Sequence, residues 1–240
     1  MEHRTLGSTG IPVTEIGLGT WEIGGDWGDV SEQEGIEAVT TALDSGIDFL
    51  DTADVYGDGR SERLIRRALD AADVDPESIT IATKAGRRID PHTADGYSRA
   101  DFEKFIDRSI ENLGVETLDV LQLHCPPTDV YYRPGVFEGL EALKQAGKIA
   151  HYGVSVEKVE QALKAIEYPG VETVQIIFNP FRQRPAELLF QEAKRRDIGI
   201  IVRVPLASGL LTGALSRDTE FASDDHRNFN RDGSAFDRGE

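Results

Sequence analysis

The stretch 118–155, LDVLQLHCPPTDVYYRPGVFEGLEALKQAGKIAHYGVS, contains the pattern that decides the fold. Two short runs of mostly apolar residues, 118–124 and 151–155, enclose an amphipathic stretch at 134–146 that is followed by Gly147. Apolar runs on both sides of a helix are typical of parallel β-strands that are buried on both faces. This stretch therefore predicts a strand–helix–strand unit.

The same alternation of apolar runs and amphipathic stretches continues in both directions along the chain. Ser31 is a suitable helix N-cap with Glu34 as its capping-box partner, and Ser98 with Asp101 forms a second such pair. We expect further helices at 31–43, 61–71, 98–113, 157–166 and 185–196. We expect further strands at 16–20, 48–52, 80–85, 173–179 and 199–205.

Parallel strands that alternate with helices form either a doubly wound sheet or a (β/α) barrel. A doubly wound dinucleotide-binding domain would carry G-x-G-x-x-G after its first strand, and the runs that begin at Gly17 and Gly57 do not complete this pattern. We therefore predict an α/β protein with the (β/α)8 TIM barrel fold, a single domain over residues 1–240. An N-terminal β-hairpin over residues 4–13 is expected to plug the N-terminal end of the barrel.

The last part of the chain differs from the rest. A (β/α)8 barrel closes with eight strands, and the pattern predicts seven of them. Residues 216–240 are polar and have neither helix nor strand periodicity. We interpret them as the long loop after the seventh strand and expect the chain to be a fragment that stops before the eighth. A disordered acidic tail is the alternative.

Composition limits the classes of partner. The chain has 43 acidic and 26 basic residues and a formal net charge of −17, which argues against binding to nucleic acid or anionic membranes. No apolar run approaches the ~18 residues of a membrane span, and no secretory signal is present, so we expect a cytoplasmic protein. The single cysteine and the scattered histidines predict no disulfide and no metal site.

The acid excess has two interpretations. It is compatible with the solubility of an ordinary acidic protein. Alternatively, only 7 of the 26 basic residues are Lys and the rest are Arg, and an acid-rich, Lys-poor surface suits concentrated salt, where screening removes self-repulsion. We adopt a halophilic, salt-adapted protein as the hypothesis.

Candidate catalytic groups follow from the barrel, because active sites lie at the C-terminal ends of its strands. The expected strand ends bring Asp51, Lys84 and His124 to one face, with Tyr56 on a neighbouring loop. A Lys ammonium stabilises tyrosinate, a carboxylate holds the Lys, and a His orients a substrate oxygen. This set suits carbonyl reduction with Tyr as the general acid, and a reduced nicotinamide cofactor is then needed to supply hydride.

Residues 46–57, GIDFLDTADVYG, resemble a signature of the aldo-keto reductases, and the chain as a whole resembles the bacterial and archaeal branches of that family. Thr83-Lys84, 121–124, 153–155 and Val174-Gln175 resemble further motifs of the family. The resemblance implies a catalytic tetrad of Asp51, Tyr56, Lys84 and His124. It also implies NADP(H) as cofactor, with NAD(H) as the alternative, and a small-molecule carbonyl or alcohol substrate.

By the same resemblance, Ser155 and Gln175 would hold the nicotinamide carboxamide, and Asp51 also lies at the cofactor. The other implied cofactor contacts are Gly19, Thr20, Trp21, Arg203, Pro205, Leu206, Ser208 and Gly209. The implied substrate pocket consists of Trp21, Trp27, Tyr56 and His124. Two positions depart from the family, which often has Asn where this chain has Val156, and a ring-stacking Tyr where it has Arg203. A planar guanidinium also stacks on a ring, although Arg203 could instead pair with a carboxylate.

Two other functions remain open at this point. Potassium-channel β subunits resemble the same family, so a non-catalytic, cofactor-sensing binding subunit is one alternative. A sugar dehydrogenase that works mainly in the direction of oxidation is the other. The oligomeric state does not follow from the sequence.

Overall fold

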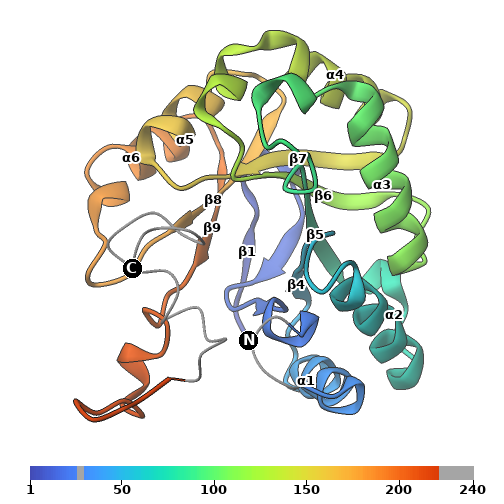
Figure 1. Cartoon of the computed structure of the whole chain (residues 1–240), viewed down its shortest axis with the longest axis vertical. Helices are drawn as coiled ribbons and strands as arrows, with labels where there is room; N and C mark the ends of the chain where they lie inside the picture. The colour runs from blue at the N-terminus through green and yellow to red at the C-terminus, as the bar shows by residue number, and fades with distance from the viewer. Residues whose placement is uncertain (26–29, 222–240) are drawn as a thin grey trace.

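The computed structural model describes residues 1–25 and 30–221. Its centre is a parallel sheet in which the strands lie in sequence order from β3 to β9, curled into most of a barrel (Figure 1). The α/β class and the parallel sheet of the predicted TIM barrel are therefore confirmed. The strands of this sheet are β3 (Leu18–Gly19), β4 (Phe49–Asp51), β5 (Thr80–Ala85), β6 (Leu118–His124), β7 (Ile149–Ser155), β8 (Val171–Ile177) and β9 (Gly199–Arg203).

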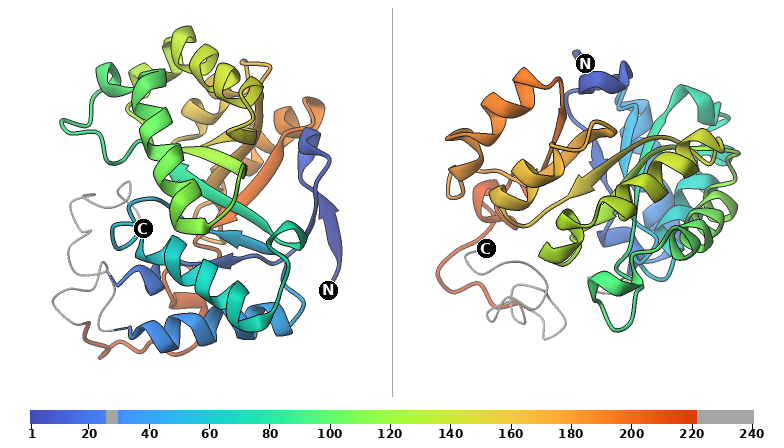
Figure 2. Two further views of the ribbon diagram at one scale, coloured as in Figure 1. Left: turned by 90° about the vertical axis from the view of Figure 1, so that its right-hand side faces the viewer. Right: turned by 90° about the horizontal axis from the view of Figure 1, so that it is seen from above.

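Helices cover the outer face of the sheet, and each lies between two consecutive strands (Figures 1 and 2). The α-helices are α1 (Glu32–Asp44), α2 (Arg60–Ala72), α3 (Arg99–Leu113), α4 (Pro134–Gln145), α5 (Val159–Ala165) and α6 (Leu189–Arg195). Short 3-10 helices are η1 (Gly7–Thr9), η2 (Glu22–Gly24), η3 (Pro76–Ser78), η4 (Ala94–Gly96), η5 (Thr128–Tyr132), η6 (Arg184–Ala186) and η7 (Leu210–Thr212).

Local signals fix the helix starts as the sequence predicts. Ser31 and Glu34 form the complete capping box of α1. At α3 the Ser98 hydroxyl accepts the backbone N–H of Asp101, which satisfies one of the free donors of the first turn. Gly114 ends α3 with φ +72°, a left-handed conformation that glycine adopts without steric cost.

The predicted N-terminal hairpin is also present, formed by β1 (His3–Thr5) and β2 (Pro12–Thr14). It covers the N-terminal end of the barrel. The Ser8 N–H donates to the Asp197 carbonyl at 2.6 Å, just before β9 begins. An inner cluster then closes this end of the barrel. Its buried members are Leu6, Val13, Phe49, Ala82, Val120 and Ile201.

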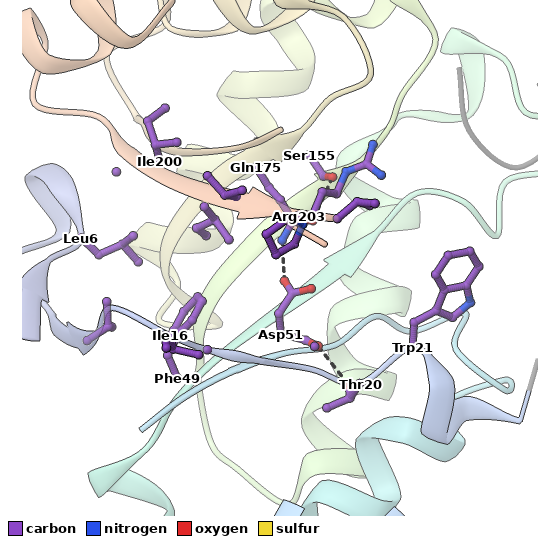
Figure 3. Close-up of a pocket in the computed structure, with 18 of the residues that line it drawn as sticks. Leu6, Ile16, Thr20, Trp21, Phe49, Asp51, Ser155, Gln175, Ile200 and Arg203 are labelled. Carbon is purple, nitrogen blue, oxygen red and sulfur yellow. Dashed lines mark hydrogen bonds between the residues drawn. The ribbon is translucent and has the colours of Figure 1, made fainter. Parts of the chain in front are cut away.

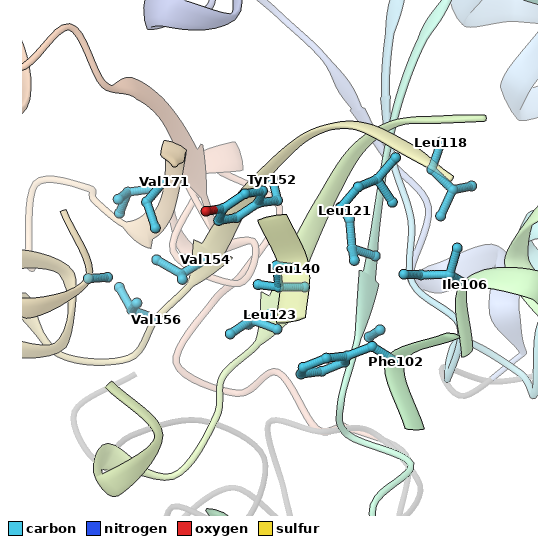
Figure 4. Packing of buried hydrophobic residues seen from close by; sticks show 14 of the residues in the cluster. Phe102, Ile106, Leu118, Leu121, Leu123, Leu140, Tyr152, Val154, Val156 and Val171 are labelled. Atoms are coloured by element: carbon cyan, nitrogen blue, oxygen red, sulfur yellow. The ribbon is translucent and has the colours of Figure 1, made fainter. Parts of the chain in front are cut away.

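The main hydrophobic core lies between the sheet and the helices. Side chains of α3 and α4 pack against the outward-facing residues of β6 and β7 (Figure 4). Phe102 and Ile106 from α3 are fully buried there, as are Leu121 and Leu123 from β6. Burying apolar side chains of this size contributes about 1.5–3 kcal/mol each. This layer supports the strands that carry the site.

The structure corrects two of the predicted element ends. The strand expected at 173–179 ends at Ile177, so Asn179 lies in the following turn, where its side chain donates to the Val204 carbonyl at 3.1 Å. The strand expected at 199–205 ends at Arg203. Val204 has φ +54°, which an extended strand does not allow, and Pro205 offers no N–H for a ladder bond.

Within the described residues, β3 and β9 are the two edge strands of the sheet. An eighth parallel strand is not among the elements of residues 1–25 and 30–221. Most of the polar stretch 216–240 lies outside these residues, so its interpretation as a long loop stays a prediction. The described helices include none with the length and apolar character of a membrane span.

Candidate active site

The side chains expected to carry the chemistry meet at the C-terminal ends of the strands. Asp51 is the last residue of β4, His124 of β6 and Ser155 of β7, and Lys84 is the penultimate residue of β5. In the parallel register Lys84 lies beside Gln122, and His124 lies beside Ser155. Asp51, His124 and Ser155 line a cavity of about 1330 Å³ that extends to the hairpin (Figure 3).

The loop that carries Tyr56 is held against β5 by the backbone. The Thr52 N–H donates to the Ala82 carbonyl at 2.8 Å, and the Asp54 N–H donates to the Lys84 carbonyl at 3.2 Å. Gly57 allows the loop to turn, because its φ is +57° and a Cβ there would lie 1.8 Å from the Gly24 carbonyl oxygen. The glycine in the motif DTADVYG is therefore required by a close approach of two loops.

Lys84 is the centre of the predicted tetrad. Its side chain is 1% exposed. Its Nζ donates to Asp51 Oδ2 at 2.7 Å, to the Thr52 carbonyl at 2.7 Å and to the Tyr56 hydroxyl at 3.3 Å. The ammonium thus joins the carboxylate to the phenol in one buried unit. The structure brings these three predicted residues into direct contact.

Burial and the neighbouring charges shift the pKa values of Lys84 and Tyr56 in opposite directions. Burial alone would lower the pKa of the Lys84 ammonium, but the oxygens of Asp51 and Tyr56 outweigh it and raise the pKa above its usual value. Burial raises the pKa of the Tyr56 hydroxyl, and the Lys84 charge offsets part of this rise. Lys84 therefore stays protonated and makes Tyr56 a better proton donor than burial alone would allow.

His124 completes the set as a neutral imidazole. Its ring meets the Tyr56 ring edge-on, with centroids 5.8 Å apart and an interplanar angle of 87°. Burial lowers the pKa of His124 well below its ordinary value, and the cations Lys84 and Arg87 lower it further. Nδ1 is buried without a hydrogen-bond partner among the described residues. A neutral His can donate one N–H to a substrate oxygen without competing for the proton on Tyr56.

Two amides hold the other oxygen of Asp51. Gln175 Nε2 donates to Asp51 Oδ1 at 2.7 Å, and Gln122 Nε2 donates to the same oxygen at 3.3 Å. The Ser155 hydroxyl in turn donates to Gln175 Oε1 at 3.1 Å. A hydrogen-bonded chain therefore runs from Ser155 through Gln175 and Asp51 to Lys84. Gln122 was not predicted as a site residue, although its position two residues before His124 places its side chain on the same face of β6.

All the residues expected to contact the cofactor line this one cavity. Ser155 and Gln175 lie above Asp51, and Trp21 lies toward one side (Figure 3). The remaining members in the cavity wall are Gly19, Thr20, Arg203, Pro205, Leu206, Ser208 and Gly209. Of the expected substrate pocket, Trp21, Tyr56 and His124 also line the cavity. Trp27 lies outside the described residues.

The two departures from the family lie next to each other. The Val156 side chain is fully buried in the outer core, so it offers no polar group to a carboxamide. Its carbonyl accepts from Arg203 Nη2 at 3.2 Å, and the same nitrogen lies 3.8 Å from Cys125 Sγ. These contacts hold the Arg203 guanidinium at the cavity wall.

The donors in the cavity fit a nicotinamide dinucleotide. Ser155 and Gln175 are buried, line the cavity, and carry a hydroxyl and an amide. In the segment after β9, Ala207 and Ser208 have φ values of +48° and +52°, followed by Gly209 at +93°. The N–H groups of Ala207 and Gly209 donate within this turn to the carbonyls of Val204 and Leu206 at 3.2 and 3.1 Å. Ser208 lines the cavity, and its hydroxyl suits a phosphate as a donor. Clusters of three or more His, Cys, Asp or Glu suited to a metal are absent from the described residues.

Comparisons with known proteins agree with this geometry. The model of the Aldo/keto reductase family matches residues 15–238. Aldo-keto reductase YhdN from Bacillus subtilis is 32% identical over 234 residues, which cover 95% of this chain and 69% of the relative. The structure of aldo-keto reductase AKR11C1 from Bacillus halodurans in its holo form matches with a TM-score of 0.79 and 26% identity, covering 93% of this chain and 73% of that one.

A third relative has a different role in its name. The probable voltage-gated potassium channel subunit beta of Arabidopsis thaliana is 27% identical over 240 residues, covering 95% of this chain and 72% of the relative. The family match extends over nearly all of the sequence and includes every member of the tetrad. This chain belongs to the aldo-keto reductase family.

Proposed function

We propose that this protein reduces the carbonyl group of a small molecule with NADP(H), and that it catalyses the reverse oxidation with the same residues. One observation carries the proposal. Buried Lys84 donates from Nζ to both Asp51 and the Tyr56 hydroxyl, and these two partners line a cavity together with His124. This arrangement provides a proton donor whose acidity is tuned by a buried cation, beside a neutral hydrogen-bond donor for the substrate oxygen.

Each residue has a separate task. Tyr56 donates its proton to the carbonyl oxygen as negative charge develops there. Lys84 stabilises the tyrosinate that remains, and Asp51 keeps Lys84 charged and in place. His124 directs its N–H toward the same oxygen and fixes the orientation of the carbonyl. When bound, the nicotinamide supplies the hydride.

The cofactor would lie along the wall that the strand ends form. Ser155 and Gln175 would hold the carboxamide, since both line the cavity and carry a hydroxyl and an amide next to Asp51. Arg203 would stack on the nicotinamide ring in place of the aromatic residue common in the family. The segment 205–209 would lie along the pyrophosphate, with the Ser208 hydroxyl as a donor. We propose NADP(H) as the preferred form because the family generally uses it.

The remaining assignments follow from composition and the family. The substrate would be a small carbonyl compound or alcohol, with Trp21 as an aromatic wall stacked 5.9 Å from the Tyr56 ring. The charge of −17 supports a protein that does not bind nucleic acid or anionic membrane surfaces. We propose that it works in the cytoplasm.

A cofactor-sensing binding subunit is the second candidate. The similarity to a probable potassium channel subunit beta supports it, and an intact tetrad is compatible with it. Such a protein would bind NADP(H) and form a stable complex with a membrane protein, but would turn over no member of a carbonyl panel. Measuring reduction of aldehydes and oxidation of aldoses in parallel also separates a reductase from a sugar dehydrogenase.

The decisive experiment compares Tyr56→Phe with Tyr132→Phe. Tyr132 is 65% exposed on η5 and is not among the residues that line the cavity, so it is a matched control. We expect Tyr56→Phe to lower kcat for NADPH-dependent reduction by about 10²–10⁴-fold, while cofactor affinity measured by fluorescence stays the same. Reduction by Tyr56→Phe at the rate of the unmodified protein would disprove the role of Tyr56.

A further inference from the structure

Arg87 lies two residues beyond β5 and lines the same cavity as Tyr56 and His124. Its side chain is 31% exposed, and Nη2 donates to Glu157 Oε1 at 3.2 Å. Glu157 is itself fixed, because its backbone carbonyl accepts from Arg182 Nη2 at 3.1 Å. The guanidinium is therefore held at the cavity by a neighbouring loop and remains partly accessible.

Arg87 and Arg203 are cations in the wall of the cavity near the catalytic residues, and Asp51 and Glu22 are carboxylates in the same wall. Lys84 and Glu157 do not line the cavity, and they pair with Asp51 and Arg87 respectively. The positive charges of Lys84, Arg87 and Arg203 all lower the pKa of His124, after burial as the first cause. A partly exposed guanidinium in the cavity wall, such as that of Arg87, attracts an anionic group of a ligand more strongly than a neutral one.

The carboxylate of Asp51 is already engaged by Lys84, Gln122 and Gln175. Lys84 is a member of the tetrad, whereas Arg87 is not. Its guanidinium has five N–H donors in a planar fork, and the contact with Glu157 uses one nitrogen. This fork matches the two oxygens of a carboxylate better than an ammonium does.

We propose that Arg87 binds a carboxylate of the substrate, so that the preferred substrates are carbonyl compounds that also carry a carboxylate group. The inference rests on the proposed function, since it names the substrate class of the same cavity. Tyr56 and His124 would take the carbonyl oxygen, and Arg87 would take the carboxylate and fix the orientation of the molecule between them. Arg87 is then the residue that determines specificity.

The test uses 4-formylbenzoate and methyl 4-formylbenzoate, which share the aldehyde and differ in charge. We expect the unmodified protein to have the higher kcat/KM for the acid. Arg87→Gln should lower the ratio of kcat/KM for acid over ester by roughly tenfold or more, and Arg87→Lys by less. Arg88→Gln is the matched control, because Arg88 Nη1 donates to Asp58 at 2.6 Å and Arg88 is not among the residues that line the cavity.

A binding measurement separates this inference from the proposed function. Tryptophan fluorescence, to which Trp21 in the cavity wall contributes, reports binding of each aldehyde in the presence of NADP⁺, without any turnover. If neither aldehyde is reduced, the proposed function fails, and the binding measurement alone decides the inference. Weaker binding of the acid to Arg87→Gln, with unchanged binding to Arg88→Gln, supports it. Equal affinity of the unmodified protein and Arg87→Gln for the acid, with both folded by circular dichroism, overturns it.

Discussion

The amide of Gln175 donates a 2.7 Å hydrogen bond to the carboxylate of Asp51, although the two residues are 124 positions apart in the sequence. Gln175 also accepts from the Ser155 hydroxyl, and Asp51 holds the ammonium of Lys84. The residues proposed to bind the nicotinamide carboxamide are thus connected directly to the residues proposed to control the proton. Substitution of a residue that would bind the carboxamide should therefore also affect proton donation by Tyr56.

Gln175 and Gln122 allow this connection to be tested, because both donate to the same Asp51 oxygen. We expect Gln175→Leu to weaken cofactor binding by roughly tenfold, the loss of one hydrogen bond, and also to lower kcat. Gln122→Leu removes a donor to Asp51 at a residue that does not line the cavity, so kcat should fall a few-fold while the Kd of the cofactor is unchanged. Fluorescence titration and steady-state kinetics measure both values. An equal loss of cofactor affinity in the two variants would contradict this division.

Lys84 is expected to matter for stability as well as for activity. Lys84→Met leaves the Asp51 carboxylate without its cation in a largely buried site, which should cost about 3 kcal/mol of unfolding free energy. Adding Asp51→Asn removes the uncompensated charge, so the double variant should regain part of this stability but none of the reductase activity. Urea denaturation and single-turnover reduction measure the two effects. A double variant as unstable as Lys84→Met would show that the charge is not the cause.

The buried carboxyl group of Asp54 leads us to predict that the stability of the folded protein depends on pH. Its side chain has no exposed surface, and neither carboxylate oxygen has a hydrogen-bond partner among residues 1–25 and 30–221. Burial and the neighbouring Glu62 raise its pKa from 3.8 to about 7, against the opposing charges of Arg88 and Arg108. In the unfolded chain Asp54 releases its proton near its ordinary pKa. The stability that the raised pKa provides is therefore present below about pH 4 and is lost as the pH rises through about 7.

The Asp54→Asn variant has no ionisable group at this position, so its stability should not fall in this way as the pH rises. The unfolding free energy of Asp54→Asn minus that of the unmodified protein should therefore be larger at about pH 8 than at about pH 4, by about 1–4 kcal/mol. Urea denaturation at both pH values measures the change, with Asp70→Asn on the exposed face of α2 as the matched control. The same difference between variant and unmodified protein at both pH values would exclude a raised pKa for Asp54.

The charge of −17 leads to a prediction about salt. If the protein is adapted to concentrated salt, screening should reduce the repulsion among its acidic side chains and raise the melting temperature by several degrees between low and molar KCl. Thermal unfolding followed by circular dichroism at both KCl concentrations measures this. Equal melting temperatures would leave ordinary solubility as the explanation of the acidic surface.

Much of the fold could be predicted because its signals are local. The apolar runs at Thr80–Ala85 and Leu118–His124 coincide with β5 and β6. Ser31 and Ser98 mark the starts of α1 and α3. The end of β9 was wrong by two residues, because the positive φ of Val204 depends on the contact of its carbonyl with Asn179 and on the turn that follows. Periodicity contains no information about such a contact.

The sequence by itself determined the order of strands and helices, and it brought Asp51, Lys84 and His124 to one face, since parallel strands all end on the same side. Only the tertiary structure decided which groups touch. The sheet register places Gln122 beside Lys84, and the curl of the sheet brings Gln175 across to Asp51. Burial of Asp54 and the position of Arg87 depend on how loops pack over the strand ends. These contacts join residues distant in the chain, and their distances are fixed by packing rather than by any local preference.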